Sequence, residues 1–160
     1  MKYLIGRVLK PRGLRGELKV QILTNLDQAF SDLKIVKIDK TNFVVSQSSI
    51  QNGFAYLKLA GITTVESAED FRDKNIYATK SQLKLGKDDI LVDDLVGYSI
   101  LSTHGRMLGI LQSVESYGER VILNVGKYSF PYEDDFVDET NTVDRVIIIH
   151  EEMLRTEVIR

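Results

Sequence analysis

The sequence predicts a mainly β fold made of two small antiparallel β-barrels that are joined by a short linker. Short runs of aliphatic, β-branched and aromatic residues recur in both halves between Gly, Asn and Asp residues, as in small all-β domains. A polar stretch of alternating charge around Gly86 interrupts this pattern. The 160 residues suffice to bury two half-size cores. We therefore expect an N-terminal barrel over residues 1–80, a linker over 81–89 and a C-terminal barrel over 90–160.

Five short strands are expected in the first half. The segment 17–22 shows the clearest pattern, because polar and apolar residues alternate with the period of two that a half-buried strand requires. Leu18, Val20 and Ile22 would then point into the barrel. The expected strands cover residues 3–9, 17–23, 33–38, 43–46 and 54–59.

One amphipathic helix is expected near residues 64–73. Thr63 and Glu66 have the spacing of a capping box, in which two side chains satisfy free backbone N–H groups at the start of a helix. Val65, Ala68 and Phe71 then recur every three residues and give the helix one apolar face. We expect this face to cover an end of the first barrel.

The second half is expected to form another set of short strands. Turn residues fall at 103–105, at 117–118 and at Asn141, so the spacing favours a small barrel over alternating strands and helices. The charged tail from residue 151 onward is compatible with a short helix or a frayed end. The expected strands cover residues 98–101, 107–114, 121–125, 128–130 and 143–149.

Composition excludes several classes of protein and site. The chain has no cysteine, which excludes a disulfide scaffold, a cysteine nucleophile and any thiolate metal site. Lys2 and Arg7 interrupt the apolar residues at the start, and no apolar run approaches the ~18 residues of a membrane span. We expect a cytoplasmic protein without a membrane segment.

The sequence indicates neither a metal nor a cofactor. His104 and His150 are separated by 45 intervening residues and lack the paired spacing of metal ligands. The two Gly-Lys pairs lack the further glycines of a phosphate-binding loop.

We expect no catalysis. The alternative is a small enzyme, which would require a few acid–base residues to converge with shifted pKa values. Its candidates are Asp93, Asp94, His104 and Glu133.

The net charge of −2 conceals a strong asymmetry. Residues 1–86 contain 14 Lys and Arg and 8 Asp and Glu, which gives +6. Residues 87–160 contain 7 and 15, which gives −8. This division favours a polyanionic partner for the first half and a basic partner for the second, although surface charge can also vary without a partner.

The strongest local signal is a basic segment at the N-terminus. The first twenty residues contain six Lys and Arg and a single acid, Glu17. Gly13 and Gly16 permit a tight loop that would hold Arg12 and Arg15 outward, where a guanidinium group can contact phosphate. Because no aromatic RNA-recognition pattern accompanies the segment, it indicates phosphate contact rather than base stacking. The candidate RNA- or subunit-contact residues are Lys10, Arg12, Arg15 and Lys19.

Several segments occur in the order of a known family. Gly6-Arg7-Val8, the run 10–20 and Thr24-Asn25 together resemble the opening of the bacterial RimM family of ribosome maturation factors. The helix over 65–72 and the run 94–97 are similar to the family's later landmarks, the second being the entry to a C-terminal PRC-barrel. With Phe130-Pro131-Tyr132 the resemblance covers about residues 3–149.

The resemblance implies a non-enzymatic assembly factor. Such a factor would bind the free small (30S) ribosomal subunit during late maturation of its head region and support 16S rRNA processing. Its implied partners are the 16S rRNA of the head and small-subunit ribosomal protein nineteen, which the PRC-barrel would bind. We expect a monomer. The remaining alternative is a nucleic-acid-binding barrel without ribosomal specificity.

The sequence departs from the family at the entry to the second barrel. Ile90-Leu91-Val92 stands where the family commonly has an aromatic cluster. If this segment contacts the ribosomal protein, aliphatic packing must replace aromatic contact. The candidate ribosomal-protein contact residues are Ile90, Leu91, Val92, Asp93 and Asp94.

Overall fold

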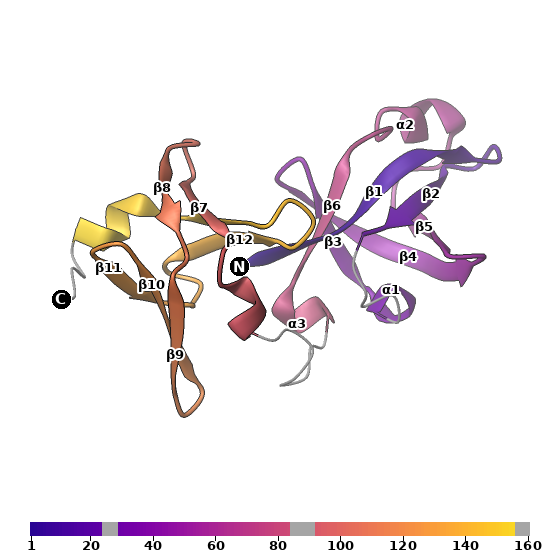
Figure 1. The fold of residues 1–160 in the computed structure, drawn as a ribbon. Helices are drawn as coiled ribbons and strands as arrows, with labels where there is room; N and C mark the ends of the chain where they lie inside the picture. Colours follow the sequence, from indigo (N-terminus) through magenta and orange to yellow (C-terminus); the bar gives the residue numbers. More distant parts are fainter. Residues whose placement is uncertain (24–28, 84–91, 156–160) are drawn as a thin grey trace. The chain divides into compact units, whose positions relative to one another are not determined.

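The computed structural model describes residues 1–23, 29–83 and 92–155 (Figure 1). The chain divides into two compact units. The first unit is Tyr3–Gly86, and the second unit is Lys87–Arg160 together with Met1–Lys2. The division falls between Gly86 and Lys87, within the expected linker 81–89. Residues 84–89 of this linker are outside the described residues.

The first unit is a closed barrel of six strands. The ring order is β2-β5-β4-β3-β6-β1, and the pairing of β1 with β2 closes it. This arrangement confirms the predicted mainly β fold with a barrel in the first half. The strands are β1 (Lys2–Arg12), β2 (Glu17–Ile22), β3 (Ile35–Ile38), β4 (Thr41–Gln51), β5 (Phe54–Leu59) and β6 (Asn75–Thr79).

Alternating residues of β2 and β5 fill the barrel. Leu18 and Val20 of β2 are completely buried, as are Ala55 and Leu57 of β5, because successive side chains of a strand point to opposite faces. Ile22 is half-buried at the end of β2. The period of two in segment 17–22 therefore predicted which face of this strand is internal.

In the described part of the first unit, three short helices accompany the barrel: α1 (Ala29–Asp32), α2 (Val65–Glu69) and α3 (Lys80–Leu83). The first part of the predicted linker thus belongs to α3, whose Leu83 is buried. Within the described residues, no helix is long and apolar enough to cross a membrane.

The helix near residues 64–73 is confirmed, but its predicted cap is wrong by one residue. Thr64, which has an extended backbone, is the N-cap of α2. Its Oγ1 accepts a hydrogen bond from the Ser67 N–H at 3.1 Å, and the Thr64 N–H donates to Ser67 Oγ at 3.3 Å. Ser67 therefore takes the place that we assigned to Glu66. The helix itself ends at Glu69, and Phe71 packs edge-on against Phe43 with ring centroids 5.2 Å apart.

The described residues of the second unit form two sheets. One has the order β12-β13-β7-β8, and the other has the order β11-β10-β9. The β13–β7 pair is parallel, in contrast to the antiparallel pairing that we expected throughout. The strands are β7 (Ser99–Ser102), β8 (Met107–Ile110), β9 (Ser113–Tyr117), β10 (Arg120–Val125), β11 (Tyr128–Pro131), β12 (Val137–Asn141) and β13 (Val146–Ile149), and 3-10 helices cover Val92–Leu95 and Glu151–Arg155.

A bend at Leu111 and Gln112 links the two sheets. The Leu111 N–H donates to the Tyr98 carbonyl at 2.8 Å, and the Gln112 N–H donates to the Asn124 carbonyl at 2.9 Å. The chain therefore passes from one sheet to the other at this point, which splits the single strand predicted over 107–114 into β8 and β9.

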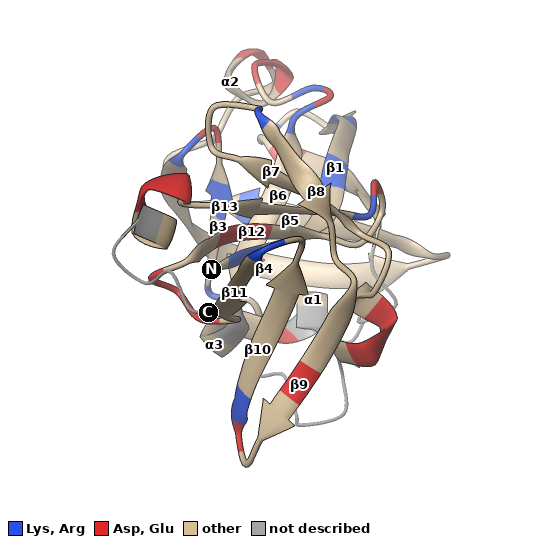
Figure 2. Cartoon of the chain, turned by 60° about the vertical axis from the view of Figure 1, so that its left-hand side comes forward, with Lys and Arg blue, Asp and Glu red and all other residues tan. Residues whose placement is uncertain are grey.

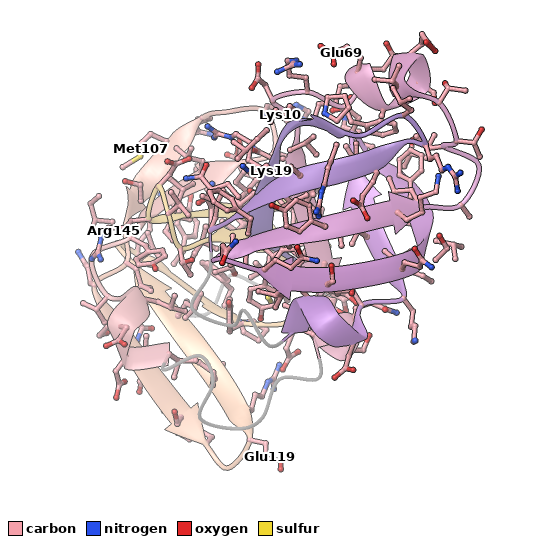
Figure 3. All side chains as sticks on the ribbon, turned by 90° about the vertical axis from the view of Figure 1, so that its right-hand side faces the viewer. Lys10, Lys19, Glu69, Met107, Glu119 and Arg145 are labelled. Atoms are coloured by element: carbon pink, nitrogen blue, oxygen red, sulfur yellow. The ribbon has the colours of Figure 1, made fainter. Side chains whose placement is uncertain are left out.

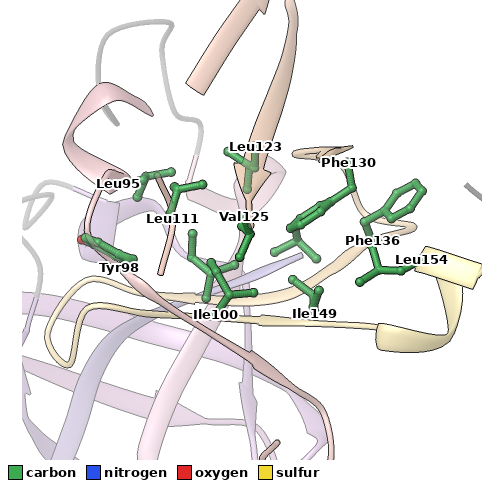
Figure 4. Close-up of a cluster of buried hydrophobic side chains, with 12 residues drawn as sticks. Leu95, Tyr98, Ile100, Leu111, Leu123, Val125, Phe130, Phe136, Ile149 and Leu154 are labelled. Carbon is green, nitrogen blue, oxygen red and sulfur yellow. The ribbon is translucent and has the colours of Figure 1, made fainter. Parts of the chain in front are cut away.

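Hydrophobic side chains from both sheets form the core of the second unit (Figure 4). Phe130 is fully buried, and its ring stacks on that of Phe136 with centroids 6.1 Å apart. Met1 packs against the same core, and its terminal ammonium group lies 3.0 Å from Asp134 Oδ1. These contacts explain why Met1 belongs to the second unit.

Candidate nucleic-acid interface

The predicted basic loop is a tight hairpin turn between β1 and β2. Gly13 and Gly16 have φ values of +68° and +90°, in the region that favours glycine. Gly16 also lies directly against the chain that follows β5, because a Cβ there would be 2.3 Å from the Ile62 carbonyl oxygen. Lys58 Nζ donates to the carbonyl oxygens of Arg15 and Ile62, the latter at 2.6 Å. The turn is therefore fixed to the barrel at two points.

The structure places the predicted contact residues on or beside this hairpin. Arg12 and Arg15 are exposed, as predicted, and Leu14 between them is 81% exposed. Lys10 is exposed on β1, and Lys19 is half-buried on β2. Figure 3 shows both lysines on the two adjoining strands. Three of the four candidate side chains are thus freely accessible to a partner.

Lys10 and Lys19 lie directly opposite each other in the β1–β2 ladder. A bulge after Val8 produces this register. Residues that are directly opposite share one face of the sheet, and two like charges in such a pair are unfavourable by roughly 0.2–1 kcal/mol. An anion bound between the ammonium groups would relieve this repulsion.

Two aromatic rings from β5 lie beneath the cations of the hairpin. The guanidinium carbon of Arg12 is 4.1 Å from the ring centroid of Tyr56. The ammonium nitrogen of Lys19 is 4.2 Å from the ring centroid of Phe54. Each is a cation–π contact, worth about 0.5–1 kcal/mol at an exposed site. Neither ring is among the residues that the sequence predicts for the site, although the alternation in segment 54–59 could have placed both on the outer face.

The register of the sheet arranges this surface in two rows across β1, β2, β5 and β4. In each row a cation on β1 is followed on β5 by an aromatic ring and on β4 by an uncharged polar residue. We call these eight residues together with Arg12 the cation–aromatic face. The first row is Lys10, Lys19, Tyr56 and Ser49, and the second row is Arg7, Gln21, Phe54 and Gln51.

The cation–aromatic face carries a net positive charge. Arg12 pairs with Glu17, with Nη1 and Oε1 3.6 Å apart, so that one acid offsets one of the four cations. Arg7 donates from Nε to the neutral amide oxygen of Asn75 at 3.1 Å and keeps its charge uncompensated there. Figure 2 shows basic segments on β1. The face is therefore suited to a polyanion.

The candidate protein-contact residues of the second unit divide into three groups. Ile90 and Leu91 lie outside the described residues. Val92 is half-buried and packs against the core of the second unit. Asp93 and Asp94 are exposed in the first turn of the 3-10 helix Val92–Leu95. The two carboxylates are accessible to a basic partner.

Comparison with known proteins identifies the family. The model of the RimM N-terminal domain family matches residues 3–83. Over 155 residues, the chain is 34% identical to the ribosome maturation factor RimM of Prosthecochloris aestuarii, covering 87% of this chain and 88% of that protein. The chain belongs to the RimM family. The RimM of Aquifex aeolicus is 27% identical over 159 residues, which cover 94% of this chain and 95% of the relative.

A solved RimM structure is also similar to this chain. It is the 16S ribosomal RNA processing protein RimM of Pseudomonas aeruginosa, which is 17% identical and covers 94% of this chain and 97% of its own. Its TM-score is 0.48. The matches in sequence extend over both units of this RimM-family chain, while the family model itself covers the first.

The acid–base residues of the enzyme alternative lie on separate elements of the RimM-family fold. Asp93 and Asp94 lie in the 3-10 helix, whereas His104 is exposed in the turn between β7 and β8. Glu133 follows β11 and accepts from Arg120 Nε at 3.1 Å. The residues that the structure describes contain no group of three or more His, Asp or Glu placed to hold a metal ion.

The pKa of Glu115, on strand β9, is lowered by hydrogen bonds within the β9–β10 hairpin. A hydrogen bond from Asn124 Nδ2, 2.9 Å long, lowers the pKa of Glu115, and a second from the Tyr117 hydroxyl at 2.8 Å acts in the same direction. Donation to this carboxylate raises the pKa of Tyr117. Figure 2 shows an acidic segment on β9, the strand that contains Glu115. These contacts stabilise the hairpin and require no substrate.

Proposed function

We propose that this RimM-family chain is a non-catalytic ribosome maturation factor. It binds the free small (30S) subunit during late maturation of the head region and supports 16S rRNA processing. The observation that carries the proposal is the cation–aromatic face on the family's N-terminal domain, since a ribosomal particle presents a dense array of phosphates. The name of the relatives, ribosome maturation factor, supports the same function.

The first unit supplies the contact with rRNA. Lys10, Arg12, Arg15 and Lys19 bind phosphates around the β1–β2 hairpin. Because Gly16 and Lys58 fix the turn to the barrel, little backbone conformational entropy is lost when the arginines bind. Contacts of this kind supply affinity and salt dependence.

The second unit supplies the contact with small-subunit ribosomal protein nineteen. Its residues, counted with Met1–Lys2, carry a net charge of −7, because 8 Lys and Arg stand against 15 Asp and Glu. Charge complementarity of this kind accelerates and orients the association with a basic protein. Asp93 and Asp94 face that partner, and Ile90, Leu91 and Val92 add apolar contact beside them. The factor acts in the cytoplasm as a monomer.

Sedimentation of the full chain with ribosomal particles tests this function. The chain is mixed separately with free small subunits, large subunits and whole ribosomes, and each mixture is run through a density gradient at two salt concentrations. We expect co-sedimentation with the free small subunit alone, and less of it at the higher salt.

The particle that binds distinguishes the proposed function from its alternatives. Equal binding to all three particles would indicate a general nucleic-acid-binding barrel. A chain that stays at the top of every gradient at both salt concentrations would contradict the ribosomal function.

A further inference from the structure

The cation–aromatic face contains more than a phosphate site requires. Phe54 and Tyr56 remain half-buried on the outer surface, while Ala55 and Leu57 of the same strand fill the barrel. Cations suffice to bind phosphates, whereas partly exposed aromatic rings beside cations are typical of surfaces that stack bases. We propose that this face binds an unpaired segment of RNA, with its bases stacked at Tyr56 and Phe54. The inference rests on the proposed function and specifies which form of RNA the first unit binds.

The order of the strands separates three kinds of chemistry. Cations lie on β1 and β2, aromatic rings on β5, and Ser49 and Gln51 on β4 opposite those rings. Neighbouring strands are about 4.8 Å apart, so β2 and β4 are separated by roughly 10 Å. One nucleotide lying along the first row can therefore place its phosphate near the two lysines, its base at Tyr56 and the edge of its base near the Ser49 hydroxyl.

Arg12 provides a second stacking surface above Tyr56. The carbon of the guanidinium group lies over the ring, 4.1 Å from the ring centroid, while the side chain remains 46% exposed. Glu17 holds the edge of the group at 3.6 Å. Bases in single-stranded RNA stack on guanidinium planes as well as on aromatic rings. Because the Arg12 side chain is exposed above Tyr56, its guanidinium plane can continue the stack, which a lysine could not do.

The register of Lys10 and Lys19 favours a phosphate at the start of the first row. The two lysines are directly opposite, and Lys19 is held over Phe54 at 4.2 Å. Two lysines at directly opposite positions of the ladder can both reach one phosphate group. A base-paired duplex would present the same phosphates but would keep its bases inside the helix. The rings therefore favour unpaired RNA.

Binding of short RNAs to the full chain tests the inference. The probes are an unstructured single-stranded RNA of about ten nucleotides and a blunt duplex of the same sequence, each titrated at several salt concentrations. The variant Phe54→Leu, Tyr56→Leu keeps apolar volume and removes both rings. We expect it to bind the single strand roughly 10- to 100-fold more weakly, with an unchanged salt slope, and to bind the duplex as the unaltered chain does.

Two further variants separate stacking from charge. Arg12→Lys keeps the charge and removes the plane, so it should weaken single-strand binding without changing the salt slope. Lys10→Gln, Lys19→Gln should lower the slope by about 0.7 for each phosphate that is no longer neutralised. Tyr117→Leu is the matched control, since this ring is 63% exposed on the second unit and its removal should have no effect.

Photocrosslinking of the unaltered chain gives a second readout if the double leucine variant fails to fold. RNA carrying 4-thiouridine should crosslink to Tyr56 or Phe54, as identified by mass spectrometry. Unchanged affinity of a folded double leucine variant, or crosslinks confined to other parts of the chain, would overturn the inference. The proposed function would stand in that case if the chain still sedimented with the small subunit, so that the two failures are distinguishable.

Discussion

Gly16 is the residue at which the hairpin depends most directly on the absence of a side chain. Gly16→Ala adds a Cβ 2.3 Å from a backbone oxygen at φ +90°, so we expect a loss of roughly 2–4 kcal/mol in the free energy of unfolding. Gly13→Ala is the matched control. It has a similar φ of +68° but faces open space, and should cost about 1 kcal/mol. Urea denaturation measures both, and equal losses would show that Gly16 is not constrained by Ile62.

Individual residues were predictable where a local rule decides their environment. Arg12 and Arg15 could be assigned to the surface because glycines flank the turn. Phe54 and Tyr56 could be placed on the outside of a strand by their alternation, yet not beneath Arg12 and Lys19. That juxtaposition depends on the pairing of β2 with β5, strands that are far apart along the chain.

The start of helix α2 gives a test at the level of the element. Thr64→Ala removes the oxygen that accepts from the Ser67 N–H, and should reduce the free energy of unfolding by about 1 kcal/mol. Thr63→Ala should have little effect, because the capping hydrogen bonds belong to Thr64. Thermal melting of the two variants compares them. A larger loss of stability in Thr63→Ala would instead support the cap that the Thr63–Glu66 spacing predicts.

The β9–β10 hairpin should lose stability in acid. The pKa of Glu115 is lowered from its usual 4.5 in the folded chain, so its hydrogen bonds stabilise the hairpin fully above about pH 4.5. This contribution is lost as the pH falls through the lowered pKa, because the protonated carboxyl accepts these bonds less well. Titration of the Glu115 side chain by NMR measures the shift. Tyr117→Phe removes one donor and should move the pKa back toward 4.5; no movement would assign the shift to Asn124 alone.

The elements that were predicted well have strong local patterns. Segment 54–59 was predicted with the bounds of β5, and the turn at Asn141 is present because Asn141 Oδ1 accepts from the N–H groups of Val143 and Asp144. Strand β12 was missed because most of its residues are polar or charged. Glu139 and Thr140 are nevertheless buried, and such a pattern resembles a loop when the sequence is considered alone.

At the scale of the whole molecule, the division of charge predicts which arginines matter for subunit binding. Replacing Arg12 and Arg15 together with Ala should weaken binding of the small subunit by about 2–6 kcal/mol at most, at ~1–3 kcal/mol for each charged contact. Arg106→Ala, Arg120→Ala is the matched control, since both arginines are exposed on the second unit and pair with Glu151 and Glu133. Sedimentation at moderate salt compares the variants. Unchanged binding of the first variant would exclude the hairpin from the interface.

Because the barrel of the first unit is a closed ring, it can finish folding during synthesis only after its last strand has been made. Strand β1 lies between β2 and β6, and Val8 exchanges backbone hydrogen bonds with Lys74 and Asp73. A nascent chain can form the local β1–β2 hairpin early. The other edge of β1, which pairs with β6, stays unpaired until residue 79 has left the ribosome. A chain that is terminated before β6 therefore exposes the backbone of β1 to pairing with other chains. Premature termination in this interval should yield fragments that aggregate, whereas release after β6 leaves the barrel without a free edge.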